Sequence, residues 1–319
     1  LDNGRSQLSS KRGYYYARDS LAFFRDSVVV VDSLFSLRTD SLRFQTATEV
    51  AYFLGPTRID QEEADIYCEN GFYDIPNQQA LFSQNAQYQK GEQRASADSM
   101  YYDGNKKEIL LSGNVVVREP GKLAIANRIR YLEEQEKYYL YGDAYLLNDG
   151  QEVRSDTVVF DAKNDVYTTA GRSTLSDSSQ ILQADFLDYD GATGRGLATG
   201  QVYWQDTTEQ ISILCQRAIY DKACDYLLAV GERPLFISGV QEDSLYMTAD
   251  TLEALGACDS TDTAGRRILA YRDVRIYKSD LQAKADSLTY SESDSLFTLY
   301  PLSNKPLIWA DTSQMKGDT

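Results

Sequence analysis

The chain has 319 residues, a formal net charge of −16, 24 tyrosines and no histidine. Binding of DNA or RNA requires a basic stripe, and none is visible in this acidic sequence, so nucleic acid is not an expected partner. The absence of histidine removes the commonest general base and metal ligand. Asp/Glu pairs could still act as acid and base, but the sequence shows no phosphate-binding glycine loop and no CxxC pair. We therefore predict a protein that is not an enzyme, with no catalytic residues, no cofactor and no metal.

Residues 1–10 precede the recurring pattern described below and are interpreted as an N-terminal leader. The chain begins at Leu1 without a recognisable signal peptide, so we interpret it as a mature or shortened form from which the export signal is absent. Its longest apolar run, Val28 to Val31, is far shorter than the ~20 residues that a membrane-spanning helix requires. The abundance of tyrosine and the scarcity of proline favour β-strands.

From residue 40 to residue 185 an acidic or amide residue recurs every 29 positions, and we call these residues the rungs. The rungs in strict register are Asp40, Glu69, Asp98, Asn127, Asp156 and Asp185. Most rungs are followed fifteen positions later by a glycine, at Gly55, Gly113, Gly142, Gly171 and Gly200. Lys11 occupies the rung position upstream, and after about residue 205 the register loosens to Gln216, Asp250 and Asp286. This period predicts ten repeats in one continuous domain over 11–309, with a tail at 310–319.

Each repeat has the pattern of two strands joined by a turn. Apolar residues lie two and four positions after the rung, as in Met100 and Tyr102, and a turn follows at 103–105. Apolar residues occur again at alternate positions in the second half of the repeat, as in Leu111 and Val117. Alternation with period two is typical of strands. We predict an all-β fold of about twenty antiparallel strands, in which the repeated glycine bends the sheet along one line and the apolar face turns inward.

The rungs allow two interpretations. A row of carboxylates could hold divalent cations, but the row includes Asn127 and Gln216 and shows no dense cluster of oxygen ligands. The alternative, which we favour, is that each rung accepts backbone N–H groups at a turn. Because unpaired carboxylates are not stable in an apolar core, we expect the rungs at a strand start, a bulge or a wet edge.

The four cysteines include two that directly precede a rung, Cys68 and Cys215, and we interpret these as small buried hydrophobic residues. Cys224 and Cys258 lie eight positions after the rungs of consecutive repeats, so stacked turns could bring them within disulfide distance. A disulfide between Cys224 and Cys258 is therefore a hypothesis that a count of free thiols would test.

The recurring phrase resembles the OstA-like family of periplasmic lipopolysaccharide-transport proteins, which includes LptA and the periplasmic domain of LptD. The phrase appears as Ala97-Asp98, Tyr102 and Leu111-Ser112-Gly113-Asn114-Val115, and it returns around Asn127 and Asp185. The resemblance covers about residues 11–309. It implies an open β-jellyroll with an apolar interior that binds the acyl chains of lipopolysaccharide.

From the pattern alone, a closed apolar core is the better interpretation of the inner stripe, because most apolar strand faces pack against protein. The resemblance reverses this preference and makes the inner face a candidate lipid site. The residues that we predict to line it are Leu42, Met100, Leu111, Val117, Ile129, Leu140, Leu146, Val158 and Leu187.

The sequence therefore predicts a non-catalytic lipid-binding protein that carries or bridges lipopolysaccharide to the outer membrane. The expected location is the periplasm, with association to the outer membrane. Expected partners are lipopolysaccharide or a related acylated lipid, and other transport components or further copies joined through edge strands. The alternative is a structural cell-surface repeat protein, a stalk or adhesin, with a filled core and no lipid ligand.

Overall fold

The computed structural model describes residues 6–32, 35–61, 64–240, 243–256, 266–291, 296–301 and 305–310. This part of the chain is an antiparallel all-β jellyroll of 26 strands. It contains two single-turn 3₁₀ helices, and no helix in it is long and apolar enough to cross a membrane. The chain divides into two compact units, residues 1–150 with 157–163, and residues 151–156 with 164–319. We call these the first unit and the second unit.

The strands of the first unit are mostly 10 to 12 residues long, as the repeat predicts. They are β1 (Ser6–Ser9), β2 (Arg12–Tyr16), β3 (Leu21–Asp32), β4 (Ser36–Gln45), β5 (Val50–Gln61), β6 (Ala64–Asp74), β7 (Gln79–Lys90), β8 (Gln93–Asp103), β9 (Glu108–Glu119), β10 (Lys122–Leu132) and β11 (Lys137–Asn148), with η1 (Glu133–Gln135) before β11. Strand β12 (Gln151–Asp161) contributes to both units.

The strands of the second unit are shorter on average. They are β13 (Val166–Ala170), β14 (Ser173–Ser176), β15 (Gln180–Ala184), β16 (Phe186–Asp190), β17 (Arg195–Asp206), β18 (Ile211–Asp221), β19 (Tyr226–Val230), β20 (Leu235–Val240), β21 (Asp243–Thr248), β22 (Thr251–Leu255), β23 (Arg267–Lys278), β24 (Leu281–Ser291), β25 (Leu296–Tyr300) and β26 (Leu307–Ala310), with η2 (Lys222–Cys224) before β19.

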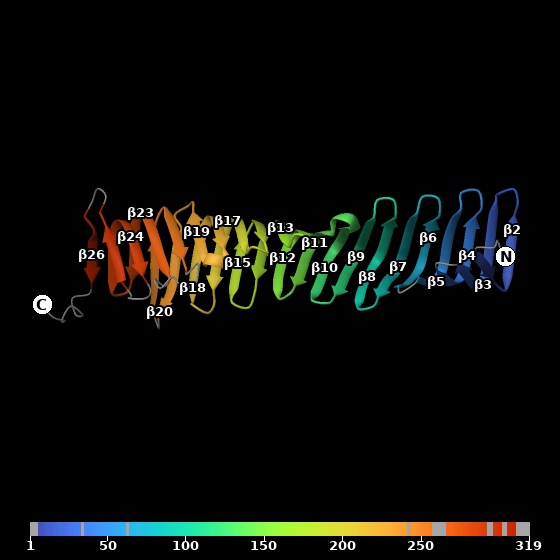
Figure 1. Ribbon diagram of the computed structural model, residues 1–319, viewed down its shortest axis with the longest axis horizontal. Coiled ribbons are helices and arrows are strands. Elements are labelled where there is room, and N and C mark those ends of the chain that lie inside the picture. The colour runs from blue at the N-terminus through green and yellow to red at the C-terminus, as the bar shows by residue number, and fades with distance from the viewer. Residues whose placement is uncertain are drawn as a thin grey trace. The chain divides into compact units, whose positions relative to one another are not determined.

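Within the first unit, each strand from β3 to β10 pairs antiparallel with the next strand along the chain (Figure 1). Every one of these pairings has a break in register near its middle, for example between Arg25 and Val28 in β3 and between Ser83 and Ala86 in β7. The breaks fall at successive rungs and at the residues fifteen positions after them. They therefore form one continuous line, which we call the crease, and the predicted bend is confirmed.

The crease exists because a rung side chain occupies the space that a glycine leaves empty on the neighbouring strand. A Cβ atom added to Gly113 would lie 2.1 Å from a carboxylate oxygen of Asp98, and one added to Gly142 would lie 2.6 Å from the amide nitrogen of Asn127. Both glycines have positive φ, +77° and +75°, a backbone conformation that side chains with a Cβ disfavour. Glycine at this position thus serves both as a bend and as a site of close approach.

The crease divides the sheet into two walls. In the first unit the first wall comprises 12–16, 21–25, 42–45, 50–54, 70–74, 79–83, 99–103, 108–112, 128–132, 137–141 and 157–161, and the second wall comprises the strand segments on the other side of the crease. One core cluster takes residues from both, including Phe24 and Phe53 of the first wall and Leu37 and Ile59 of the second. The apolar faces of the two walls therefore face each other, as the period-two pattern predicts. The side opposite the crease, where the turns of the two walls approach, is called the seam.

In the second unit the crease often interrupts the strands completely. Strands β13 and β14 lie on either side of 171–172, and β15 and β16 on either side of Asp185. This splitting raises the count to 26 strands from the predicted twenty or so. Within the segment interpreted as a leader, β1 pairs with β3, while residues 311–319 of the predicted tail lie outside the described residues. The single continuous domain over 11–309 stays a prediction.

Candidate functional site

The interior of the first unit carries a continuous row of apolar side chains along its first wall. Cross-strand partners run from Leu42 to Phe53, and from Met100 through Leu111 and Ile129 to Leu140. Because partners in an antiparallel sheet stand on the same face, the sequence-predicted residues Met100, Leu111, Ile129 and Leu140 form one contiguous strip. The structure thus brings together residues that lie up to 40 positions apart in the sequence.

A second row lies nearer to the seam, and we call it the seam row. It consists of the residue four positions after each rung and the residue eleven positions after the same rung. These residues are cross-strand partners on neighbouring strands. In chain order it contains Phe44, Ala51, Tyr73, Ala80, Tyr102, Ile109, Tyr131 and Tyr138. Aromatic rings therefore alternate with alanines from β4 to β8, which leaves room between the rings. Our sequence-based site list omitted this row, although its spacing was visible.

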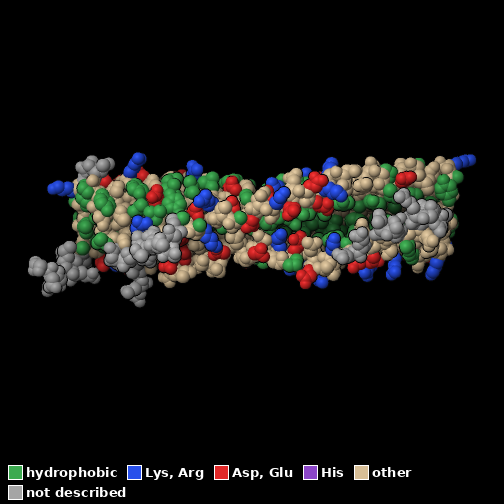
Figure 2. All heavy atoms as spheres, viewed as in Figure 1, with side chains coloured by type: hydrophobic (Ala, Val, Ile, Leu, Met, Phe, Trp, Pro, Cys, Tyr) green, Lys and Arg blue, Asp and Glu red, His purple; other side chains and the backbone are tan. Residues whose placement is uncertain are grey.

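The interior of the first unit is accessible over part of its length. Phe44, Ala51, Tyr73 and Tyr102 of the seam row are all partly exposed although they point inward. Val117, on the inner face of the second wall, is also partly exposed. Figure 2 shows a recess with hydrophobic side chains on its floor in the region of β7 to β9. We call the inner apolar face of β4 to β9, where most of the seam row is partly exposed, the groove.

On the groove floor, two phenylalanine rings approach each other across a glycine, which has no side chain to separate them. Phe53 and Phe82 stack with centroids 6.5 Å apart and planes inclined by 4°, on the two strands that flank Gly71. A Cβ atom at Gly71 would lie 2.2 Å from the carbonyl oxygen of Leu81 and 3.3 Å from the Phe53 ring. The absence of a side chain here lets the two rings approach across the intervening strand.

The deeper inner side chains are fully covered from β10 onward, although Tyr131 and Tyr138 of the seam row stay partly exposed. Ile129, Leu140, Leu146 and Val158 are at most 1% exposed, although the sequence predicted them as lipid-contacting residues. Leu187, in the second unit, is similarly covered at 2%. Among the predicted residues, Val117 is the one that the structure leaves partly exposed, while Leu42, Met100 and Leu111 lie on the groove floor with small exposed fractions. The role of all nine in lipid binding stays a prediction.

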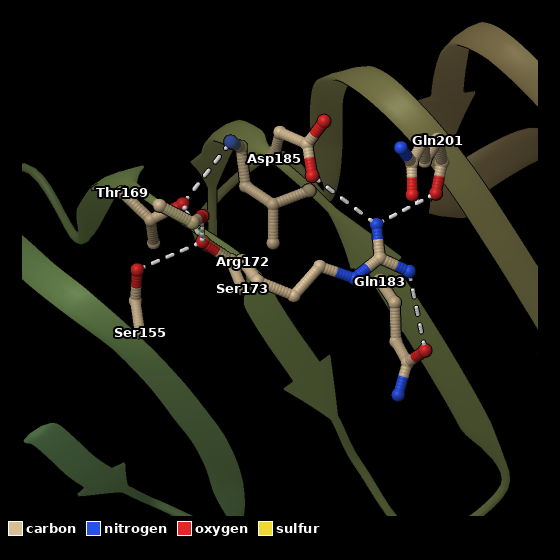
Figure 3. A network of polar contacts seen from close by, with 9 residues as sticks. Ser155, Thr169, Arg172, Ser173, Gln183, Asp185 and Gln201 are labelled. Atoms are coloured by element: carbon tan, nitrogen blue, oxygen red, sulfur yellow. Dashed lines mark hydrogen bonds and ion pairs between the residues drawn. The ribbon is translucent and has the colours of Figure 1, made fainter.

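The second unit has a packed interior with polar contacts at its crease. The hydroxyl groups of Ser155 and Ser173 lie 2.9 Å apart, and Ser173 donates to Thr169 at 2.6 Å. All three are buried, and their hydrogen bonds satisfy the hydroxyl groups (Figure 3). On the outer side of the crease, Arg172 contacts the Asp185 carboxylate at 3.4 Å and donates to the Gln201 carbonyl at 2.8 Å. These contacts link neighbouring strands along the crease of this unit.

Polar contacts also cross the seam of the second unit. The Tyr220 hydroxyl donates to the Gln180 side chain at 2.7 Å, and the Lys222 ammonium lies 3.2 Å from the Asp177 carboxylate. Burial alone raises the pKa of Asp177, but N–H donors from Ser179 and Gln180 and the Lys222 charge outweigh it and lower the pKa. A cavity of about 30 Å³ lies beneath these groups, which is room for one or two waters at most.

The rungs lie at the crease and are mostly exposed, as expected for carboxylates that cannot be buried unpaired. The Asp98 carboxylate accepts from the Asn114 side chain at 3.2 Å, and Asp185 pairs with Arg172. The turn N–H groups are instead bound by a second acidic ladder, five positions after the rungs. Asp74, Asp103, Asp190 and Asp221 accept from backbone N–H groups two or three residues later.

The preferred interpretation of the rungs as turn carboxylates was therefore wrong for the rungs whose contacts are described. The rung covers a neighbouring glycine, and the residue at the fifth position binds the turn because it ends the strand. The alternative of cation binding finds no support in geometry, since the described residues contain no group of three or more side chains able to ligate a metal.

The cysteines differ in exposure. Cys68 is fully buried at 0% exposure and Cys215 is partly buried, which confirms the interpretation of Cys68 as a small core residue. Burial raises the pKa of both thiols to about 11. The proposed disulfide partner of Cys224, Cys258, lies outside the described residues, so that pairing stays a hypothesis.

Because the thiolate is the reactive form, we expect Cys68 and Cys215 to resist alkylation in the folded protein. At pH 8 a thiol with a pKa near 11 is about 0.1% ionised, against roughly a quarter for an unperturbed thiol. Mass spectrometry after a short iodoacetamide pulse should find both residues labelled at least tenfold more slowly in buffer than in 8 M urea. Equal rates in the two solvents would contradict the buried environment.

The N-terminal part of this chain matches a known protein family model. Residues 7–137 match a family model described as LptA/(LptD N-terminal domain) LPS transport protein. A comparison with curated proteins found no match. Among solved structures the chain is similar to LptH, the LptA-homologous periplasmic component of the lipopolysaccharide transport device of Pseudomonas aeruginosa, at 11% identity and a TM-score of 0.19, over 52% of this chain and 81% of that chain.

A second solved structure with detectable similarity is the WD40 domain of SCAP from fission yeast. The identity is 10% and the TM-score 0.15, over 97% of this chain and 89% of that chain. Because both TM-scores are below 0.5, neither structure contributes to the argument that follows.

Proposed function

We propose that this chain binds lipopolysaccharide through its acyl chains in the groove of the first unit, because residues 7–137 match a family model described as LptA/(LptD N-terminal domain) LPS transport protein. The matched residues include β2 to β10, which contain every strand of the open groove. The single observation that supports this proposal most strongly is the agreement between the matched segment and the accessible part of the interior.

The chemistry of the groove suits acyl chains. Each CH₂ group transferred from water into an apolar environment contributes about 0.8 kcal/mol, so several chains would be held strongly. The attraction is non-directional, and a carrier needs a cargo that can slide. The net charge of −16 opposes the anionic head group, so the head group stays in solvent at the seam, where cations screen the repulsion.

The proposed partners follow from the two edges of the described sheet. Strand β2 pairs with β3, and Tyr14, Tyr15 and Tyr16 are about half exposed on it. Strand β26 pairs with β24 and exposes Leu307, Ile308 and Trp309 to a similar degree. Edge strands with apolar side chains invite strand addition, so we infer that these edges join further copies or other components of a periplasmic transport system.

Two consecutive tyrosines allow a direct test. Tyr102 points into the groove, whereas Tyr101 stands on the outer face of the same strand, and both are partly exposed. With p-benzoyl-phenylalanine in place of Tyr102, ultraviolet irradiation should cross-link purified lipopolysaccharide, because the photoreactive ring replaces a ring in the groove. The same probe at position 101 should give at least tenfold less product. Equal yields at the two positions, or none at either, would refute binding in the groove.

A further inference from the structure

The side chain at the position eleven residues after each rung becomes larger from the first repeat to the fifth. It is alanine in the first three repeats, at Ala22, Ala51 and Ala80, then isoleucine at Ile109 and tyrosine at Tyr138. All of these belong to the inner face of the first wall near the seam. The space between aromatic rings that characterises β4 to β8 therefore disappears at β11.

At that point the rings pack against one another without a gap. Tyr131 and Tyr138 stack with centroids 4.4 Å apart, and Phe160 follows at 6.2 Å from Tyr138. The three residues come from successive strands, β10, β11 and β12, and all three lie in the first unit. The alternation of aromatic residues with alanines, seen in the seam row from β4 to β8, is thus replaced by a continuous stack of aromatic rings.

The turn between β9 and β10, in the second wall, closes over this stack from the other side of the seam. The Tyr138 hydroxyl donates to the Glu119 carboxylate at 3.2 Å. The Lys122 ammonium lies 5.9 Å from the centroid of the Tyr138 ring and 5.5 Å from that of Phe160, within cation–π range. Lys122 and Glu119 are also paired, at 3.7 Å. Burial and the Glu119 charge raise the pKa of Tyr138, so its hydroxyl remains a donor at neutral pH.

One repeat earlier, the same two positions are occupied by Lys90 and Gln93. Both side chains are exposed. The polar contacts described for residues 70–106 link neighbouring strands or turns within one wall, such as Gln79 with Asp103 at 3.2 Å. The hydrogen bond from Tyr138 to Glu119 across the seam therefore has no counterpart one repeat earlier, where Ile109 and Lys90 occupy these positions.

We propose that Tyr131, Tyr138 and Phe160, held by Glu119 and Lys122, form an end stop that confines acyl chains to the part of the groove between β4 and β9. This inference rests on the proposed function. The confined stretch spans five strand spacings, or about 24 Å at ~4.8 Å per strand. Because the stop lies inside the first unit, cargo enters and leaves through the open seam and does not pass beneath Tyr138.

The test compares photo-cross-linking of purified lipopolysaccharide at two inward positions of the full chain. Position 102 lies in the open groove, and position 146 lies on the covered second wall of β11. In the otherwise unaltered protein we expect product at 102 and at least tenfold less at 146. In the Tyr138→Ala, Phe160→Ala variant we expect the yield at 146 to rise at least fivefold while that at 102 persists.

The matched control is Tyr139→Ala, which removes a ring from the outer face of the same strand and should leave the ratio unchanged. If the double variant fails to fold, Glu119→Ala with Lys122→Ala removes the hydrogen bond, the ion pair and the cation–π contacts at the seam and should raise the yield at 146 in the same direction. Product at 146 equal to that at 102 without either change overturns the stop but leaves the proposed function intact. No product at either position overturns the function itself.

Discussion

Replacement of Gly113 by alanine is expected to destabilise the first unit by about 2–4 kcal/mol. The added Cβ would lie 2.1 Å from the Asp98 carboxylate, which cannot retreat without losing its contact with Asn114. The residue also has a φ of +77°, where a side chain costs about 1–2 kcal/mol by itself. Urea denaturation followed by circular dichroism should show a lower midpoint.

Gly91→Ala is the matched control for this prediction. Gly91 also has positive φ, +56°, but an added Cβ would find no atom within 4 Å. Its replacement should therefore cost only the backbone term, about 1 kcal/mol. If the two variants lost the same stability, close packing of the rung against the glycine would not be the cause of the crease.

Replacement of Ala51 by tryptophan is expected to weaken lipopolysaccharide binding at least tenfold, or about 1.4 kcal/mol. Ala51 stands between Phe44 and Tyr73 in the seam row and is partly exposed, so an indole there would fill the space between the two rings. Since the site is already accessible to solvent, the larger side chain can be accommodated with little cost to folding. Equilibrium binding of radiolabelled lipopolysaccharide measures the change.

The control for the groove is Leu54→Trp, which places the same indole on the outer face of the same strand. Leu54 is 39% exposed, so its replacement alters neither the interior nor the pairing of β5. Its affinity for lipopolysaccharide should match that of the unaltered protein. A loss of affinity in Leu54→Trp as large as in Ala51→Trp would indicate that binding does not take place in the groove.

Much of the fold follows from local features of the sequence. Alternation of apolar residues around Met100 and Leu111 identifies strands and their inner face, because successive side chains of a strand point to opposite sides. The spacing between Asp98 and Gly113 identifies the crease, since a glycine in a strand indicates a bend or a close approach. Both features repeat every 29 residues, so an ambiguous strand or bend assignment in one repeat can be settled by comparison with the other repeats.

The details of the crease could not be derived in the same way. Strict alternation placed Asp98 on the inward side with Met100, but the register break beside it turns Asp98 outward while Ala97 and Met100 are both buried. The break depends on the pairing with β9, which a single strand does not specify. For the same reason the turn-binding role was assigned to the rungs, whereas Asp103 and its equivalents perform it.

The sequence by itself determined the repeat, the strand faces and the line along which the sheet bends, because these depend on residues within one strand or its immediate neighbour. Only the tertiary structure decided which part of the interior is open. Tyr102 and Tyr138 are both partly exposed, but only Tyr138 has a described hydrogen bond to a turn of the opposite wall, from its hydroxyl to Glu119. That contact joins Glu119 of the second wall to Tyr138 of the first wall. The 29-residue pattern describes the residues within each wall, so it does not predict a contact between the walls.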